Sequence, residues 1–352
     1  MKLCFVTENW SETGDGAYLI AILDGLYKNG HDLSVILTGD ERSPDGYEYI
    51  RFYPAGMHGN PFSVTKNKRE LLMKLLKSNS FDLILPFGCY PGMRILAVKN
   101  ACSCPVWVVL RNDPEFMPKS AVLRVIRDVL YKKADGFVFQ NKLQQEYFLD
   151  RMNLKGVVIP NFILIPSFSC ASDAQKERTI ACISRLDERQ KNLKMLFEGF
   201  IEFSKSYPEY SLKVYGEGPD REKLEAYIKE KGNEWNIKLM GDKISDTELE
   251  KAEVFVLTSR FEGSPNALIK AMSKGLTCIS TNCGGAKELI ENGKNGILID
   301  VDDSKTLRDA LCYLAENEDM RNKLAKSAFE INQTLSKENI LPLWEDAISR
   351  MR

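Results

Sequence analysis

The sequence predicts an α/β protein of two Rossmann-like domains, each a doubly wound parallel sheet, that face each other across a cleft. At 352 residues the chain exceeds the size at which one hydrophobic core stops growing. Short apolar runs alternate with helical patterns in both halves, which is typical of a parallel sheet covered on both faces. The segment PNFILIP, residues 160–166, carries two prolines and separates the two regions. We therefore expect an N-terminal domain over residues 1–163 and a C-terminal domain over residues 164–336.

The first half opens with an apolar run at residues 3–7 and a helical pattern at 17–29, which Gly30 ends. Further strands are expected at residues 33–37, 48–53, 83–86, 106–110, 136–139 and 157–159, and helices at 66–77, 91–100, 120–133 and 142–150. In the second half strands are expected at residues 179–183, 212–215, 237–240, 254–257, 277–280 and 296–299. In such sheets ligands bind beyond the carboxyl ends of the strands, so the loops after the strands should hold the functional residues.

The composition is that of an ordinary soluble protein. Forty-eight basic and forty-nine acidic side chains cancel, so the net charge gives no reason to expect a nucleic-acid partner. The nine cysteines are odd in number and scattered, which is typical of a reduced, cytosolic protein, and with two histidines no zinc set can be assembled. The chain starts with a strand pattern rather than a signal peptide, and no apolar run approaches the roughly 20 residues of a membrane span. We expect a cytoplasmic protein without a metal.

The stretch VFVLTSRFEGSPNALIKAMSKG, residues 254–275, is the strongest candidate for chemistry. An apolar strand leads into a loop that holds Glu262, and Pro265 suits the first turn of the helix that follows. The N-terminus of a helix presents free N–H groups and the positive end of a dipole, which suits a phosphate. A carboxylate at this place can accept hydrogen bonds from hydroxyl groups.

Two earlier loops supply further candidates. In SRLDERQKN, Arg185 and Lys191 flank a strand-to-helix turn, where two cations could grip a diphosphate; the alternative is a solvated loop with paired surface charges. In GEGPDREKL, Gly216 and Gly218 permit close backbone approach before a helix that starts at Pro219; the alternative is a tight turn with a good helix cap.

The first half offers acceptor-side candidates. TGDGAYL opens a helix with Gly14, Asp15 and Gly16, but Leu19 stands where a dinucleotide fingerprint requires a third glycine. The loop could instead let an acceptor approach the helix end. RNDPEF places Arg111 and Asp113 at the end of a strand, either as contacts to donor or acceptor or as a charged turn.

Two stretches of the first half are basic and amphipathic, VTKNKRELLMKLLK and MPKSAVLRVIRDVLYKK. In the second, Val122, Leu123, Ile126 and Leu130 lie on one helical face. A helix packed on the sheet with a solvated basic face explains this pattern. Peripheral docking on the inner face of an anionic membrane is the alternative.

The ordered motifs resemble the retaining, nucleotide-sugar-dependent glycosyltransferases of the GT-B fold, family four, also called glycosyl transferases group 1. The resemblance covers nearly the whole chain. Its parts are NGHDLSVIL, VIPN, SRLDERQKN, VYGEGPDREKL, SRFEGSPNALIKAM and GGAKELIENGKNGILID. Singly the glycine motifs are weak, whereas their order and spacing are specific.

The resemblance implies a donor site on the C-terminal domain. Arg185 and Lys191 would bind the donor diphosphate, and Glu262 would contact the donor sugar. With the helix dipole, the two cations would stabilise the leaving nucleoside diphosphate, so the family needs no metal. The other donor-binding residues that the resemblance implies are Gly216, Met240, Asp242, Lys243, Gly263, Ser264, Pro265, Asn266, Ala267, Leu268 and Lys270.

The implied reaction is retaining transfer of a hexose or N-acetylhexosamine from a nucleoside diphosphate sugar to a glycan or lipid-linked acceptor. UDP is the expected nucleotide. The acceptor hydroxyl would attack beside the departing phosphate, whose oxygen can take the proton, so we name no general base. The helix from Lys337, within residues 337–352, resembles the family's last helix, which packs on the N-terminal domain.

The chain departs from the family at Lys270, where relatives carry a second glutamate that accepts hydrogen bonds from ribose. An ammonium group can only donate, and it adds a positive charge. Either a neighbouring carboxylate compensates Lys270, or Lys270 reaches phosphate, or the protein is a weakened or inactive subunit that binds a partner or glycan. Ser264 replaces a common Phe, and Arg111 stands near where many relatives carry His.

Overall fold

The protein divides into two compact units. The computed structural model describes residues 1–39, 42–57, 66–164, 170, 176–232, 236–242 and 244–351. Unit 1 comprises Met1–Leu164 and Lys337–Arg352, and unit 2 comprises Ile165–Ser336. The division therefore falls one residue from the expected 163/164 boundary. Each strand and helix named above is present in this structure, with ends within three residues of those expected.

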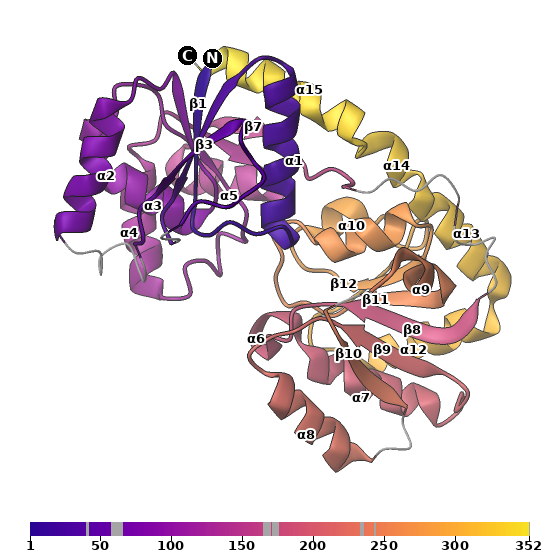
Figure 1. The fold of residues 1–352 in the computed structure, drawn as a ribbon. Helices are drawn as coiled ribbons and strands as arrows, with labels where there is room; N and C mark the ends of the chain where they lie inside the picture. The colour runs from indigo at the N-terminus through magenta and orange to yellow at the C-terminus, as the bar shows by residue number, and fades with distance from the viewer. Residues whose placement is uncertain are drawn as a thin grey trace. The chain divides into compact units, whose positions relative to one another are not determined.

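Unit 1 contains a parallel sheet with helices on both faces (Figure 1). Its strands are β1 (Lys2–Thr7), β2 (Asp32–Leu37), β3 (Ile50–Pro54), β4 (Leu83–Pro86), β5 (Trp107–Val109), β6 (Gly136–Phe139) and β7 (Gly156–Val158). Its helices are α1 (Gly14–Lys28), α2 (Lys66–Ser78), α3 (Cys89–Ala97), α4 (Ala121–Tyr131), α5 (Lys142–Met152) and α15 (Lys337–Arg350), with a 3-10 turn η1 (Lys99–Ala101).

The strand order of unit 1 is β3-β2-β1-β4, and parallel bridges at Ile84–Val106 and Phe87–Val109 join β4 to the set β5-β6-β7. The order reverses direction between β1 and β4. At such a switch point the loops at the carboxyl ends diverge and leave a crevice for ligands.

Helix α4 differs from its expected orientation. Leu130 is buried and Ile126 packs against the core, as the amphipathic pattern predicts, but Val122 is 68% exposed. Because α4 packs against the largely buried helix α3, its inward face is set by Arg127, Leu130 and Tyr131 rather than by Val122. The expected packing of Val122 is therefore wrong.

The last helix, α15, packs within unit 1 beside α1. Glu345 accepts hydrogen bonds from the Nδ2 of Asn29 at 2.7 Å, and its other oxygen lies 2.9 Å from the Nε2 of His31. The side chain of Trp344 is only 2% exposed. A Cβ atom at Gly25 would lie 2.7 Å from Leu341, so the glycine lets the two helices approach closely.

Unit 2 contains one six-stranded parallel sheet in the order β10-β9-β8-β11-β12-β13. Its strands are β8 (Glu177–Ile183), β9 (Ser211–Tyr215), β10 (Ile237–Gly241), β11 (Ala252–Leu257), β12 (Thr277–Thr281) and β13 (Ile297–Ile299). Its helices are α6 (Glu188–Lys191), α7 (Leu193–Ser204), α8 (Arg221–Lys231), α9 (Asp246–Lys251), α10 (Asn266–Ser273), α11 (Ala286–Leu289), α12 (Ser304–Glu316), α13 (Glu318–Phe329) and α14 (Ile331–Thr334). The switch point lies between β8 and β11, so the loops after these two strands should hold a ligand site.

We predict that Trp344→Ala lowers the free energy of unfolding by about 3–5 kcal/mol, because it leaves a cavity under α15. Leu343 is the matched control, since it is the preceding residue of the same helix and is 42% exposed. Leu343→Ala should cost less than about 1 kcal/mol. Urea unfolding followed by circular dichroism measures both values, and equal losses would contradict the packing of α15 on unit 1.

Candidate functional site

A buried ion pair joins the loops after β8 and β11. The Nζ of Lys191 lies 2.5 Å from the Oε1 of Glu262, and these side chains are 16% and 8% exposed. Lys191 is the last residue of α6, and Glu262 lies between β11 and α10. The pair therefore connects the two loops that flank the switch point of unit 2. The sequence predicted these two residues from separate motifs, and the structure brings them into contact.

Glu262 has two further partners. Its Oε1 accepts a 2.7 Å hydrogen bond from the hydroxyl of Ser259, and the Nε2 of Gln190 lies 3.5 Å from its Oε2. A carboxylate can accept about four hydrogen bonds, so Oε2 retains capacity for a hydroxyl group of a ligand. The ammonium group of Lys191 has three donors and can likewise contact an anion while it holds Glu262.

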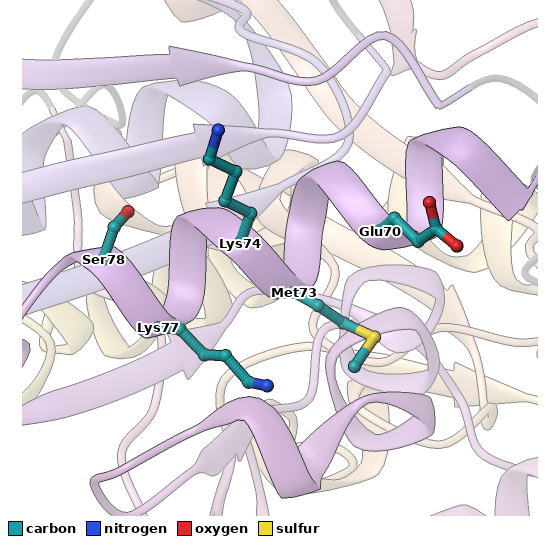
Figure 2. A pocket seen from close by; sticks show the side chains of 5 residues that line it. All are labelled: Glu70, Met73, Lys74, Lys77 and Ser78. Carbon is teal, nitrogen blue, oxygen red and sulfur yellow. The ribbon is translucent and has the colours of Figure 1, made fainter.

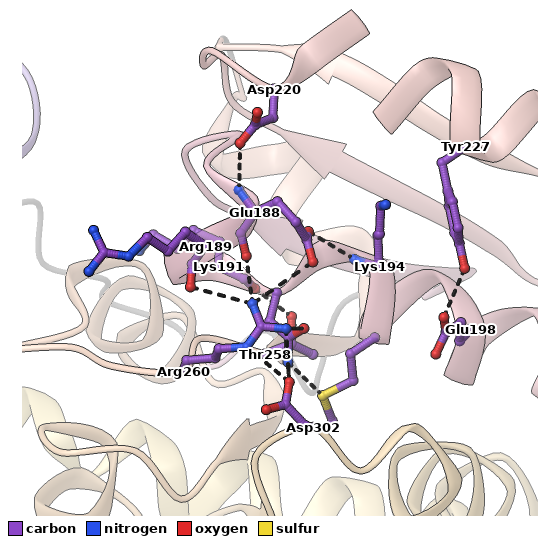
Figure 3. A network of polar contacts seen from close by, with 12 residues as sticks. Glu188, Arg189, Lys191, Lys194, Glu198, Asp220, Tyr227, Thr258, Arg260 and Asp302 are labelled. Carbon is purple, nitrogen blue, oxygen red and sulfur yellow. Dashed lines mark hydrogen bonds and ion pairs between the residues drawn. The ribbon is translucent and has the colours of Figure 1, made fainter. Parts of the chain in front are cut away.

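Arg260 fixes the two loops against each other (Figure 3). Its guanidinium donates to the backbone oxygen of Glu188 at 2.7 Å, to Asp302 at 2.9 Å and to the side-chain oxygen of Asn192 at 2.5 Å. Its backbone N–H donates to the oxygen of Gln190 at 2.8 Å. Arg260 therefore positions α6, and with it Lys191. No motif had singled it out, although it lies three residues after the end of β11 and precedes Glu262 by two residues.

Glycines let the loops after β8 and β9 pack backbone to backbone. A Cβ atom at Gly216 would lie 1.9 Å from the oxygen of Ser184, and one at Gly218 would lie 2.4 Å from the oxygen of Leu186. Gly216 also has a φ of 147°, which L residues rarely adopt. Its glycine identity is thus required by loop packing, whatever its contact with a nucleotide.

The loop after β12 packs against the loop that holds Glu262. The N–H of Gly285 donates to the backbone oxygen of Glu262 at 3.2 Å, and a Cβ atom at Gly285 would lie 2.4 Å from the oxygen of Gly263. Burial, with a smaller contribution from the Glu262 carboxylate, raises the pKa of the Cys283 thiol to about 12. The thiol is therefore protonated at neutral pH and is a poor nucleophile.

Helix α10 begins beside Glu262. Its first helical residue is Asn266, and Pro265 is the N-cap, one position earlier than expected. The N–H of Ile269 bonds back to the oxygen of Pro265 at 3.0 Å, so the N–H groups of Asn266, Ala267 and Leu268 belong to the first turn. Such groups have no acceptor within the helix and favour an anion.

Lys270 is paired with a carboxylate from the neighbouring helix. Its Nζ lies 3.0 Å from Asp246, the first residue of α9, and Lys274 binds the other oxygen of Asp246 at 2.7 Å and Glu250 at 3.2 Å. Lys270 and Asp246 are about one third exposed. Two lysines thus face two carboxylates, so the positive charge that departs from the family pattern is compensated locally.

The other expected donor-site residues lie at the same edge of the sheet. Arg185 is exposed two residues after the end of β8, Met240 is 41% exposed in β10, and Asp242 is exposed directly after β10. Lys243 lies outside the described residues. In the ranges that the structure covers, no hydrogen bond or ion pair links Arg185, Met240 or Asp242 to the Lys191–Glu262 pair.

In unit 1, Arg111 and Asp15 meet near the carboxyl ends of the strands. The guanidinium of Arg111 donates to Asp15 at 2.8 Å and to Asn161 at 2.6 Å, and it lies 4.7 Å from the ring centroid of Phe87. Gly14 and Gly16 open α1 beside Asp15, and a Cβ atom at Gly16 would lie 2.0 Å from the oxygen of Ser11. The Asp113 carboxylate instead accepts from the N–H of Glu115 at 2.9 Å, within its own loop.

A second buried arginine at this edge was missed. Arg94, on α3, is 3% exposed and donates to the hydroxyl of Thr38 at 2.7 Å and to Glu8 at 3.0 Å. Glu8 and Thr38 directly follow β1 and β2. No recognisable motif marks Glu8 or Arg94 in the sequence. Glu8 is a single charged residue after a strand, and Arg94 lies inside an apolar helix.

A shallow hollow of about 440 Å³ lies on α2 and is lined by Glu70, Met73, Lys74, Lys77 and Ser78 (Figure 2). All five residues come from α2, and none of them is a candidate residue.

Metal and membrane features can be stated for the described part of the chain. Within it, no three His, Cys, Asp or Glu residues gather as metal ligands. No helix there combines the length and apolar character needed to cross a bilayer. All nine cysteines are free thiols.

Residues 171–331 match the family described as Glycosyl transferases group 1. This segment is therefore similar to the group 1 glycosyltransferases. The match covers most of unit 2, including Lys191, Glu262 and Lys270. The chain is also 26% identical to the GalNAc-alpha-(1->4)-GalNAc-alpha-(1->3)-diNAcBac-PP-undecaprenol alpha-1,4-N-acetyl-D-galactosaminyltransferase of Campylobacter jejuni, over 100% of this chain and 99% of that protein.

Two solved structures share the fold over almost the whole chain. Sucrose-phosphate synthase from Thermosynechococcus elongatus matches with a TM-score of 0.81 at 16% identity, covering 99% of this chain and 98% of that one. HepE from Anabaena in complex with UDP matches with a TM-score of 0.79 at 18% identity, covering 99% and 100%. The two Rossmann-like units of this chain are therefore those of the GT-B fold.

We predict that Lys191→Met lowers the free energy of unfolding by about 3 kcal/mol, because it leaves the Glu262 carboxylate buried without its cation. The double variant Lys191→Met with Glu262→Gln removes both charges and should recover at least half of the loss. Urea unfolding of the wild type, both single variants and the double variant gives the coupling energy. A coupling energy of zero would contradict the ion pair.

We also predict that Lys270→Glu is less stable than Lys270→Gln by about 1 kcal/mol, because only the glutamate repels the nearby carboxylate of Asp246. Adding Asp246→Asn to Lys270→Glu should remove most of this difference. Thermal unfolding at low and high salt measures it, since salt screens the repulsion. Equal stability of the two single variants at low salt would refute the pairing of Lys270 with Asp246.

Proposed function

We propose that the protein transfers a hexose or N-acetylhexosamine from a UDP-sugar to a glycan or lipid-linked acceptor, with retention of the anomeric configuration and without a metal. The observation that carries the proposal is the Lys191–Glu262 pair beside the start of α10, at the switch point of a group 1 glycosyltransferase domain. This arrangement sets a cation and helix N–H groups for phosphate next to a carboxylate for hydroxyl groups.

In the proposed donor complex, Lys191 and Arg185 contact the diphosphate together with the first turn of α10. The diphosphate carries more negative charge than the Glu262 carboxylate and attracts the Lys191 ammonium group. Because the ammonium group has three donors, it can contact the diphosphate while it still holds Glu262. The Oε2 of Glu262 then accepts a hydrogen bond from a hydroxyl group of the sugar. Gly216 after β9, Met240 in β10 and Asp242 after β10 contact the nucleoside. Lys243, which lies outside the described residues, completes the predicted set.

The proposed chemistry joins the acceptor oxygen to the anomeric carbon as the bond from that carbon to the phosphate oxygen breaks. Both events occur on the same face of the sugar, and the acceptor proton passes to the departing phosphate. Lys191, Arg185 and the dipole of α10 stabilise the charge that develops on the leaving group. On the acceptor side, Gly14, Asp15, Gly16, Arg111 and Asp113 lie at the carboxyl edge of unit 1.

The activities for which similar proteins are named support this choice of substrates. The Campylobacter jejuni relative is named for an undecaprenol-diphosphate-linked glycan acceptor, and the solved structures include complexes with UDP and with UDP and GlcNAc. The pairing of Lys270 with Asp246 argues against an inactive subunit, because Asp246 compensates the positive charge of Lys270. A cytosolic enzyme would meet both a nucleotide sugar and a lipid-linked acceptor.

The test incubates the protein with UDP-glucose, UDP-galactose, UDP-N-acetylglucosamine or UDP-N-acetylgalactosamine and with polyprenyl-diphosphate-linked glycans. We expect UDP release with at least one pair, an α-linked product by NMR, and unchanged rates in EDTA. Glu262→Gln should lower the rate about 100-fold, whereas Glu198→Gln, an exposed glutamate bonded to Tyr227 in the same unit, should not. Absence of both UDP binding and transfer in the folded protein would refute the proposal, and UDP binding without transfer would favour the non-catalytic subunit.

A further inference from the structure

Helix α4 exposes a row of apolar side chains. Val122, Val125 and Val129 are 68%, 64% and 59% exposed, and their spacing of three and four residues places them on one face. Single exposed apolar residues are common, but a continuous row on one helix is not, since each side chain leaves apolar surface in water. We call these three residues the valine face of α4.

The valine face is presented by a fixed helix rather than by a loose segment. Arg127, on the opposite side of α4, is only 1% exposed and lies 5.2 Å from the ring centroid of Phe148 on α5. Its guanidinium also donates to the backbone oxygens of Pro114 and Met117 at 2.5 and 2.6 Å. These contacts hold α4 against unit 1 and keep the valines outward.

Exposed lysines flank the valine face. Residues 119–133 contain five basic side chains and one acidic one. Arg127 is buried on the opposite side, whereas Lys119, Lys132 and Lys133 are exposed at the two ends of α4. Helix α2, in the same unit, also contains five basic side chains and one acidic one, and its Leu71 is 49% exposed. The whole chain has a net charge of −1, so this excess is local.

We propose that α4 docks unit 1 on the surface of an anionic phospholipid bilayer. The valines enter the boundary between headgroups and acyl chains, and the lysines contact the anionic headgroups, as for an amphipathic helix that lies in the membrane interface. The charge favours a bilayer, because exposed valines flanked by lysines complement an anionic surface that has an apolar layer beneath it. The proposal is independent of the transferase activity, although it would bring the protein to a lipid-linked acceptor.

The test measures co-sedimentation with vesicles of phosphatidylcholine alone and of phosphatidylcholine mixed with phosphatidylglycerol. We expect binding to the mixed vesicles at low salt and much weaker binding in high salt or to phosphatidylcholine alone. The triple variant Val122→Asn, Val125→Asn, Val129→Asn should lower the partition coefficient at least about ten-fold. Asn and Val have similar helix propensities, so the helix should persist, and circular dichroism checks this.

A lysine series separates the local site from net charge. Replacing Lys119, Lys132 and Lys133 by Gln should lower binding to the mixed vesicles and reduce its salt dependence. The matched control replaces three exposed lysines of unit 2, Lys229, Lys305 and Lys323, by Gln and should bind like the wild type. Equal loss in the two lysine variants, wild-type binding by the triple asparagine variant, or no vesicle binding at low salt would overturn the proposal. In the last case, a soluble protein is the remaining occupant of the valine face.

Discussion

The ion pair between Lys191 and Glu262 is the contact on which the candidate site depends. Both groups are largely buried, and a buried charge is tolerated only when it is paired and hydrogen-bonded. The loops after β8 and β11 must therefore stay together, and Arg260 and Ser259 hold them there. The result is a preorganised site, in which a cation, a carboxylate and a helix N-terminus are in place before any ligand binds. Preorganised charge needs little rearrangement during reaction, which is the physical basis of its value in catalysis.

The second charged cluster extends the same logic to α9 and α10. A lysine in place of the family's second glutamate would be costly beside another cation, but here Asp246 accepts from both Lys270 and Lys274. The carboxylate at this point comes from Asp246 at the start of α9, next to the loop after β10. Position 270 thus carries a donor, and the acceptor beside it is Asp246. The residue type at position 270 alone therefore does not decide whether a nucleotide binds.

The sequence predicted the fold well because strands buried on both faces are continuous apolar runs, such as residues 254–257, and because glycine and proline mark the loops between them. It also predicted that Glu262 and Lys191 follow strands at the carboxyl edge of the sheet, which is where they lie. It could not predict their contact, nor Arg260, Asn161 and Asp246, because these partners are set by loop conformation rather than by spacing. For α4, periodicity defined faces but could not tell which face the neighbouring helix α3 covers. Val122 was therefore placed inward, and the exposed row with Val125 and Val129 was missed.

A crystal structure of the protein soaked with UDP would test most directly whether Lys191 and the first turn of α10 bind the diphosphate. We expect the β-phosphate of UDP to lie within hydrogen-bond distance of the Lys191 ammonium group and of at least one N–H group in the first turn of α10. We also expect Glu262 to stay beside Lys191, with its Oε2 facing the space next to the phosphate. UDP bound away from both Lys191 and α10, with the ion pair undisturbed, would contradict this expectation.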